Sequence, residues 1–293
     1  MIGKLIIIPR PADILNFFSL ICLTVIAVLF REKIDSASVL ILLYSSLILI
    51  QAVLIILKDR NSFLRSTYDL IFPVISILVI FDSLEKIVHY INPQDIDPVL
   101  IRLDYWLFNG HPTVMMEKIT TPLLTDILQV SYSSYYFLPV TLGIVLMAKK
   151  RDAEFDRSLF LIMLCFYLSY VGYMFFPALG PRYTISHLQN TELQGLFIAQ
   201  PLQELLNRLE GIKRDAFPSG HTGIALTVLY LAFRFERRLF LIFLPVVIAL
   251  IFSTVYCRYH YVVDVLAGII LFFITIALGE MLYKYHTKNI KRI

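Results

Sequence analysis

Residues 238–283 read RLFLIFLPVVIALIFSTVYCRYHYVVDVLAGIILFFITIALGEMLY. This stretch holds two apolar runs, 238–257 and 262–283, separated by a short polar break. Each run is long enough for a helix to cross the hydrocarbon core of a bilayer, which takes about 20 residues. The stretch therefore predicts a pair of transmembrane helices, with His260 in the connection at the membrane surface.

The rest of the chain continues this pattern. Of its 293 residues 58% are hydrophobic and 16% are charged, and the mean hydropathy is +0.74, which is more apolar than an average soluble domain. We predict an all-α, polytopic transmembrane bundle with about eight spans, folded as a single membrane domain over residues 1–293. N-terminal spans occupy 1–157 and a catalytic core occupies 158–283. The six further spans are predicted at 13–30, 37–57, 67–84, 126–148, 158–177 and 219–234.

The distribution of basic residues predicts the orientation. The net charge of +4 is small, so we expect no nucleic-acid partner. Alternate connections carry the lysines and arginines, which places these connections and both termini in the cytoplasm. The loops at about 85–125, 178–218 and 258–261 then face outward, and the 31–36 turn is ambiguous. We expect a multi-pass protein of the plasma or inner membrane. The basic residues concerned are Lys58, Arg60, Arg65, Lys149, Lys150, Arg151, Arg234, Arg237, Arg238, Lys284, Lys288, Lys291 and Arg292.

Two outward segments have the pattern of short helices lying in the interface. The first has Asp97 as its expected N-cap, Pro98 at its first position and Asn109-Gly110 at its end. The second begins at Pro201 and carries a leucine stripe. Packing against the rim of the bundle and gating of a substrate are both open for these helices.

Polar residues gather in three segments that this topology places at one depth on the outer side. They are 176–183 after the fifth span, 217–222 at the start of the sixth, and 258–264 at the start of the eighth. Because the three segments share a side and a depth, we expect them to meet in one site.

The third segment contains a candidate nucleophile. His260 and Asp264 are four apart, so on a helix they share one face. A carboxylate at that place would accept the proton of one ring nitrogen and leave the other nitrogen with a free lone pair. The structural alternative is an ion pair or hydrogen bond that holds helices together.

The second segment contains a candidate anion site. Ser219 and Gly220 open a helix whose first amide groups lack partners inside the helix, and such a terminus attracts anions. His221 follows, at a place from which it would give a proton to a departing oxygen. The alternative is an ordinary helix start with a capping serine.

Two arginines flank these segments. Arg182 and Arg258 would each donate paired hydrogen bonds to a phosphate, or else reach along the membrane surface as arginines near helix ends commonly do. The sequence shows no cluster of acidic residues or histidines with metal-ligand spacing, and its three cysteines have no such spacing either. We therefore expect neither a metal nor another cofactor.

Taken together, the segments resemble the phosphatidic acid phosphatase type 2 superfamily over about 158–283. The motifs of that family are Lys-x6-Arg-Pro, Pro-Ser-Gly-His and Ser-Arg-x5-His-x3-Asp. The second motif is complete at 218–221, and the third keeps His260 and Asp264 at the family spacing.

The resemblance implies roles for these residues. His260 would attack phosphorus and form a phosphohistidine, His221 would protonate the leaving group, and Asp264 would orient His260. The phosphate oxygens would be held by Arg182, Arg258, Ser219 and Gly220. The substrate would be a membrane lipid, and water or an alcohol would accept the phosphoryl group without a metal.

The sequence departs from the family pattern at several places. These departures look like the branch that contains inositol phosphorylceramide synthases, which transfer lipid head groups, although that branch often has leucine at the position of Gly220. A lipid phosphatase is therefore the main hypothesis, and a head-group transferase is its alternative. A third hypothesis is a transporter that uses His260 and Asp264 as a proton relay. The departures are Ser253-Thr254 for Ser-Arg, Arg258 two positions before the histidine, Phe175 for the first-motif lysine, and the inverted pair Pro181-Arg182.

Overall fold

The computed structural model describes residues 9–209 and 211–290. Within these ranges the chain forms helices and no strand. The helices are α1 Pro11–Leu29, α2 Ala37–Leu57, η1 Lys58–Arg60, α3 Ser62–Ser66, η2 Thr67–Ile71, α4 Phe72–Ile91, α5 Asp97–Phe108, α6 Pro112–Met115, η3 Met116–Ile119, α7 Pro122–Ser133, η4 Ser134–Tyr136, α8 Phe137–Ala148, α9 Asp152–Phe175, α10 Pro181–Thr184, η5 Ser186–Leu188, α11 Ala199–Leu209, α12 Gly220–Phe235, α13 Arg237–Tyr256 and α14 Val262–Ile290.

The structure confirms the prediction of an all-α, polytopic bundle. In the described part of the chain, six helices are long and apolar enough to cross a membrane. Two of the eight predicted spans do not meet this description. The helix α12 has only 16 residues, and α4 carries Asp82, Glu85 and Lys86 towards one end. The six helices are Pro11–Leu29, Ala37–Arg60, Pro122–Ala148, Asp152–Phe175, Arg237–Tyr256 and Val262–Asn289.

Two predicted boundaries differ from the structure because the backbone changes its pitch. The predicted span at 67–84 begins with a π-helical turn, Thr67–Ile71, so the regular helix α4 starts only at Phe72. A short 3₁₀ turn, Ser134–Tyr136, likewise divides the predicted span at 126–148 into α7 and α8. Both turns line the cavity described below.

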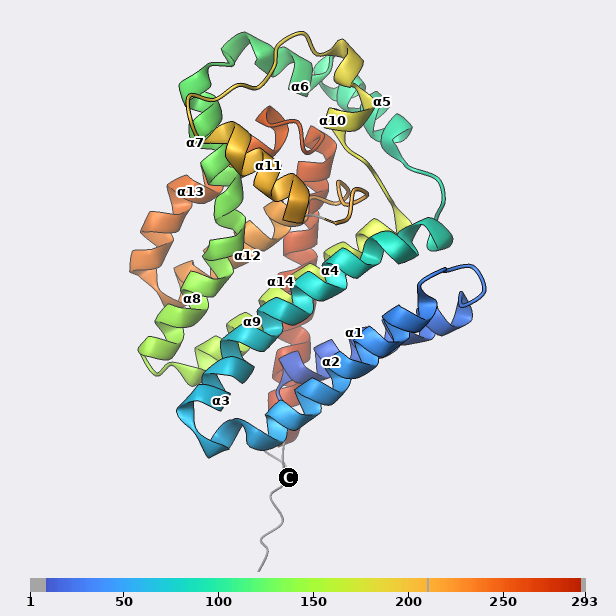
Figure 1. Cartoon of the computed structure of the whole chain (residues 1–293). Helices are drawn as coiled ribbons and strands as arrows, with labels where there is room; N and C mark the ends of the chain where they lie inside the picture. Colours follow the sequence, from blue (N-terminus) through green and yellow to red (C-terminus); the bar gives the residue numbers. More distant parts are fainter. Residues whose placement is uncertain (1–8, 210, 291–293) are drawn as a thin grey trace, which may run out of the picture.

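The helix α9 lies at the centre of the bundle. It is buried along most of its length and packs against α1, α4, α8, α12 and α14. The hairpin of α1 and α2 covers one side, and α7, α8 and α13 form the opposite side (Figure 1). This arrangement leaves α12 and α14 in contact, so that the residues at their first turns can share a site.

The basic connections gather at one end of the bundle. Ion pairs join neighbouring helices there: Lys149 Nζ contacts the Glu236 carboxylate between α8 and α13, and Arg65 lies 3.2 Å from Asp152 between α3 and α9. At the opposite end lie α5, α6, α10 and α11 (Figure 1). The basic connections are therefore at the opposite end of the bundle from α5, α6 and α10.

Both predicted interfacial helices are present. The helix α5 ends before Asn109, which has the left-handed conformation expected of a C-terminal residue (φ 52°). Asp97 is the first helical residue and not the N-cap, which is Ile96. The helix α11 begins at Ala199, and the Asp126 carboxylate of α7 accepts hydrogen bonds from the amides of residues 196–199 at its start.

Candidate active site

The three polar segments meet at the end of the bundle where the short helices lie. The amide of Ser219 donates a hydrogen bond to the Asp264 carbonyl (3.0 Å), and the amide of Arg182 donates to the Arg258 carbonyl (3.0 Å). The amide of Ala216 donates a hydrogen bond to the Ala178 carbonyl (3.1 Å). Main-chain hydrogen bonds thus hold all three segments together.

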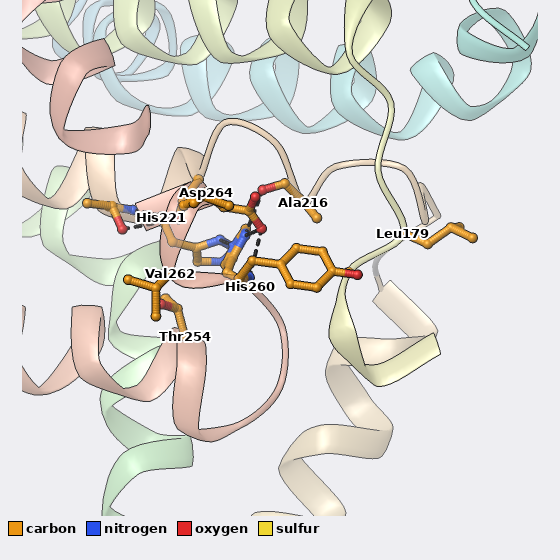
Figure 2. Close-up of polar contacts among 12 residues, drawn as sticks. Leu179, Ala216, His221, Thr254, His260, Val262 and Asp264 are labelled. Carbon is orange, nitrogen blue, oxygen red and sulfur yellow. Dashed lines mark hydrogen bonds and ion pairs between the residues drawn. The ribbon is translucent and has the colours of Figure 1, made fainter. Parts of the chain in front are cut away.

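Two histidines from different helices face each other at this junction. His260 Nε2 lies 3.4 Å from His221 Nδ1, and the rings cross at 62° (Figure 2). Both side chains are buried, with 3% and 7% of their surfaces exposed. Each imidazole is therefore withdrawn from bulk water and has a second imidazole as its neighbour.

The main chain fixes the tautomer of His260. Its Nδ1–H donates to the carbonyl of Ala216 at 2.8 Å, whereas the Asp264 carboxylate lies 3.6 Å from the same nitrogen. The sequence argument assigned this role to Asp264 because a helix would place the two side chains on one face. His260 instead precedes the first residue of α14, Val262, so that helical spacing does not apply. With the proton on Nδ1, Nε2 keeps its lone pair.

The surroundings keep the His260 ring neutral. The pKa of His260 is lowered from 6.5 to about 4. Burial is the main cause and the Arg182 charge adds to it, against opposing effects from the Asp215 carboxylate and the Ala216 hydrogen bond. A neutral ring is the form that can act as a nucleophile. The site thus favours the reactive form at any ordinary pH.

Asp264 lies beside His260 as expected, but its carboxylate makes its hydrogen bond elsewhere. It is fully buried, and its Oδ2 accepts the amide of Tyr261 at 2.8 Å. Its Oδ1 has no hydrogen-bond partner among the described residues. A buried carboxylate oxygen without a partner is unusual, and it lies beside the candidate nucleophile.

Aromatic rings enclose His221. Tyr132 stacks on it with centroids 4.4 Å apart, Tyr135 lies 4.2 Å away, and Tyr259 stacks on the far face of Tyr132 at 4.2 Å. In the sequence Tyr132 and Tyr135 are indistinguishable from ordinary interfacial tyrosines. His221 Nε2 has no partner in the described part of the chain. The cage holds the ring in place and leaves one of its nitrogens available.

Ser219 and Gly220 both have structural roles. The capping role of Ser219 was the alternative named from the sequence, whereas the role of Gly220 was not foreseen. Ser219 is fully buried and caps α12, accepting the amide of Thr222 at 3.3 Å. At Gly220 an added Cβ would lie 2.3 Å from the Tyr173 hydroxyl oxygen, so α9 requires glycine there. Both residues therefore fix the start of the helix that carries His221.

The two arginines occupy different surroundings. The Arg182 guanidinium lies over the ring of Tyr259, 4.9 Å from its centroid, and donates to Asn207 Oδ1 at 2.9 Å. The Arg258 guanidinium forms an ion pair with Glu117 at 3.0 Å. Arg182 acts electrostatically on His260, whereas Arg258 Nη2 donates hydrogen bonds to Glu117 and to the Thr191 carbonyl.

Two aspartates of α5 support the site, and the sequence argument did not recognise their role. Asp97 accepts the amides of Leu179 and Gly180 at 2.8 and 2.9 Å and the hydroxyl of Tyr261 at 2.9 Å. Asp104, two turns later on the helix, accepts the amides of Val262 and Val263, which begin α14. The spacing of seven places both carboxylates on one face of α5, and this was the available signal.

A cavity of about 180 Å³ extends from the site into the bundle. Asp215 and His221 line one end of it, and apolar residues of α4, α8 and α9 line most of the remainder. In residues 9–209 and 211–290 no group of three or more histidines, cysteines or acidic residues is arranged to hold a metal ion.

Comparisons with known proteins identify the family of the chain. The chain is 25% identical over 167 residues to a PA-phosphatase related-family protein of Dictyostelium discoideum, and the alignment covers 50% of this chain and 30% of that relative. The chain thus corresponds to less than a third of the relative's length. No solved structure matches. The sequence model of the PAP2 superfamily matches residues 99–278, which is more than half of the chain and includes His221, His260 and Asp264, so the chain belongs to the PAP2 superfamily.

Proposed function

We propose that the protein is a membrane lipid phosphatase that works through a phosphohistidine on His260. Membership of the PAP2 superfamily places it among phosphatase-type enzymes. The observation that carries the proposal is the pair of buried imidazoles, with His260 Nε2 3.4 Å from His221 Nδ1. A nucleophile and a proton donor in hydrogen-bond reach of each other are what a two-step phosphoryl transfer requires.

In the first step, the lone pair of His260 Nε2 attacks phosphorus, and the phosphate group displaces the contact between the two rings. The bond between phosphorus and the lipid oxygen breaks, and that oxygen takes a proton from His221. In the second step, water gives a proton to His221 and attacks phosphorus, and the bond between phosphorus and His260 Nε2 breaks. The products are the dephosphorylated lipid and phosphate, and the enzyme returns to its starting form.

Charge on the non-bridging oxygens needs fixed donors during both steps. Arg182 is the cation best placed for this, because its charge already acts on His260. The proposal needs no metal, since the leaving oxygen is protonated by His221 and the oxygens are held by arginine.

We also propose that the active site lies on the extracytoplasmic side. The basic connections lie at the end of the bundle away from the histidines, and such connections remain preferentially in the cytoplasm. A lipid substrate suits this placement, because its phosphate would lie at the surface while its chains stay in the membrane.

The test uses purified protein with lipid monophosphates and diphosphates in excess chelator. We expect inorganic phosphate release and an acid-labile phosphoenzyme that mass spectrometry locates on His260. The same assay is repeated with and without acceptor alcohols. Product that forms only with an alcohol supports the transferase alternative, and a phosphoenzyme located on another residue overturns the assigned nucleophile.

A further inference from the structure

The cavity beside His221 is a narrow slot that continues along the bundle. Its lining on α9 runs from Phe155 to Tyr173, a distance of about 27 Å at 1.5 Å per helical residue. The hydrocarbon core of a bilayer is about 30 Å thick, so one leaflet contributes about 15 Å. The slot therefore extends well beyond the depth of a single leaflet.

The chemistry of the slot changes along its length. Asp215 and His221 lie at the site end together with tyrosines, of which Tyr135 stacks on His221. The middle is lined by aliphatic and aromatic side chains, including Ile77, Val140 and Ile162. Dry apolar cavities accept hydrocarbon and not water. The slot thus borders His221 at the candidate site and is apolar beyond it.

One wall of the slot is contributed by a segment outside the matched family region. Leu70, Pro73, Ile77 and Phe81 belong to η2 and α4, which end before residue 99, where the family match begins. The π-helical turn Thr67–Ile71 brings Leu70 and Asp69 to the far end of the slot. The N-terminal helices of this chain therefore shape the slot.

We infer that the slot holds one long hydrocarbon chain of the lipid phosphate, and that the protein selects its substrate by the length of that chain. This inference rests on the proposed function for the position of the head group. Each methylene buried in the slot adds apolar transfer energy, so a long chain binds better than a short one until it reaches Asp69. Lipids with a chain too short to enter the slot lose this contribution.

Gly143 of α8 offers a way to block the slot. An added Cβ would lie 3.4 Å from both Leu70 and Phe155, which is ordinary contact, so a larger side chain fits by extending into the slot. The matched control is Ile144→Phe, because Ile144 is the next residue on α8, does not line the slot and is 49% exposed on the outer surface.

The experiment compares Gly143→Leu, Ile144→Phe and wild type on two substrates with the same phosphate head group and either a long or a short chain. We expect Gly143→Leu to lower kcat/KM for the long-chain substrate at least about tenfold and to leave the short-chain substrate unchanged. Ile144→Phe changes neither. Equal effects on both chain lengths, or no effect on either, overturn the inference that the slot holds the hydrocarbon chain.

A second measurement requires neither turnover nor a variant. A long-chain lipid phosphate with a photoreactive diazirine near its chain end is cross-linked to wild type, and the labelled peptides are mapped. Labelling of Leu70 or Phe155 supports the slot even if no phosphate is released, a result that would count only against the proposed function. Labelling confined to outward-facing residues such as Ile144 overturns the inference.

Discussion

The two ends of the bundle differ in how their charged groups are partnered. At the basic end Arg10 lies 3.5, 2.7 and 3.1 Å from Asp13, Asp69 and Asp156, so one guanidinium serves three carboxylates. At the other end His260 has one carbonyl partner at 2.8 Å, and Asp264 Oδ1 has none in the described chain. In the first arrangement one cation neutralises several carboxylates, which stabilises the fold, whereas in the second a buried carboxylate oxygen keeps an unused acceptor beside the candidate nucleophile.

The largest expected effect comes from removing the nucleophile. We expect His260→Ala to lower kcat at least about 10³-fold and to abolish the phosphoenzyme, because no other group supplies the lone pair. The matched change at the basic end is Lys149→Ala, which removes a half-exposed partner of Glu236 and leaves kcat unchanged. Phosphate-release assays on both purified variants make the comparison. Activity retained in His260→Ala would remove the functional distinction between the ends.

The next largest effect concerns stability at the basic end. Arg10→Met removes the cation of buried Asp13 and leaves buried Asp69 with only the more distant Arg65 (3.6 Å), and breaking such a group costs about 3–5 kcal/mol. We expect a clear fall in Tm in detergent, while the protein that remains folded keeps its kcat. The comparison is Arg65→Met, which removes a half-exposed cation from Asp152 and a longer contact (3.6 Å) from Asp69, and should lower Tm less. Equal Tm values for the two variants would contradict a stabilising role for the Arg10 cluster.

The third effect is a pH dependence at the site. The pKa of His260 is lowered to about 4, so the ring stays neutral well below pH 6.5. The acid limb of kcat/KM is therefore expected between pH 4 and 5, and Arg182→Gln should move it upward, because that charge helps to lower the pKa. The free energy of unfolding is expected to fall with pH over the same acid range. Below pH 6.5 the unfolded chain takes up a proton at this residue that the folded chain takes up only near pH 4, so stability falls over that range. An acid limb at 6.5 would contradict the burial argument.

The smallest effect concerns the support that α5 gives to the site. Asp104→Asn keeps one acceptor for the amides of Val262 and Val263 but loses its charge. Hydrogen bonds to a charged group are worth about 1.5–3 kcal/mol, and only part of this is lost, so we expect kcat to fall about three- to tenfold with little change in KM. The control is Arg102→Gln on the exposed face of the same helix, which should leave both constants unchanged. A larger rise in KM than fall in kcat would indicate a role in substrate binding.

Most of the fold was predictable because membrane helices follow directly from the lengths of apolar runs. The second span, predicted at 37–57, coincides with α2, and the end of α5 at Asn109 was read from its turn signal. The first turn of α4 was not predictable, because a π-helical turn and a regular turn have the same apolar pattern. The helix at 219–234 was predicted to within one residue of α12, but its 16 residues fall below the length on which its assignment as a full span rests.

The catalytic side chains of the site were predictable from the sequence motifs, but their hydrogen bonds to the main chain were not. The pairing of His260 with His221 follows from the two motifs and the topology. The partner of His260 Nδ1 was not predictable, because a helical spacing was assumed for a residue that precedes its helix. Asp97 was assigned to its own helix, since local capping is the only role visible in the sequence, whereas its three donors lie more than 80 residues away.

The carbonyl of Ala216 has a consequence for how this site tolerates mutation. Every amino acid supplies a backbone carbonyl, so the group that orients the reactive imidazole survives any side-chain replacement that leaves the loop in place. A substitution scan would report position 216 as limited only by size, because the residue is buried with its methyl 3.4 Å from where a Cβ on Gly180 would lie. An essential part of the chemistry would thus leave no trace in the amino-acid preferences at that position.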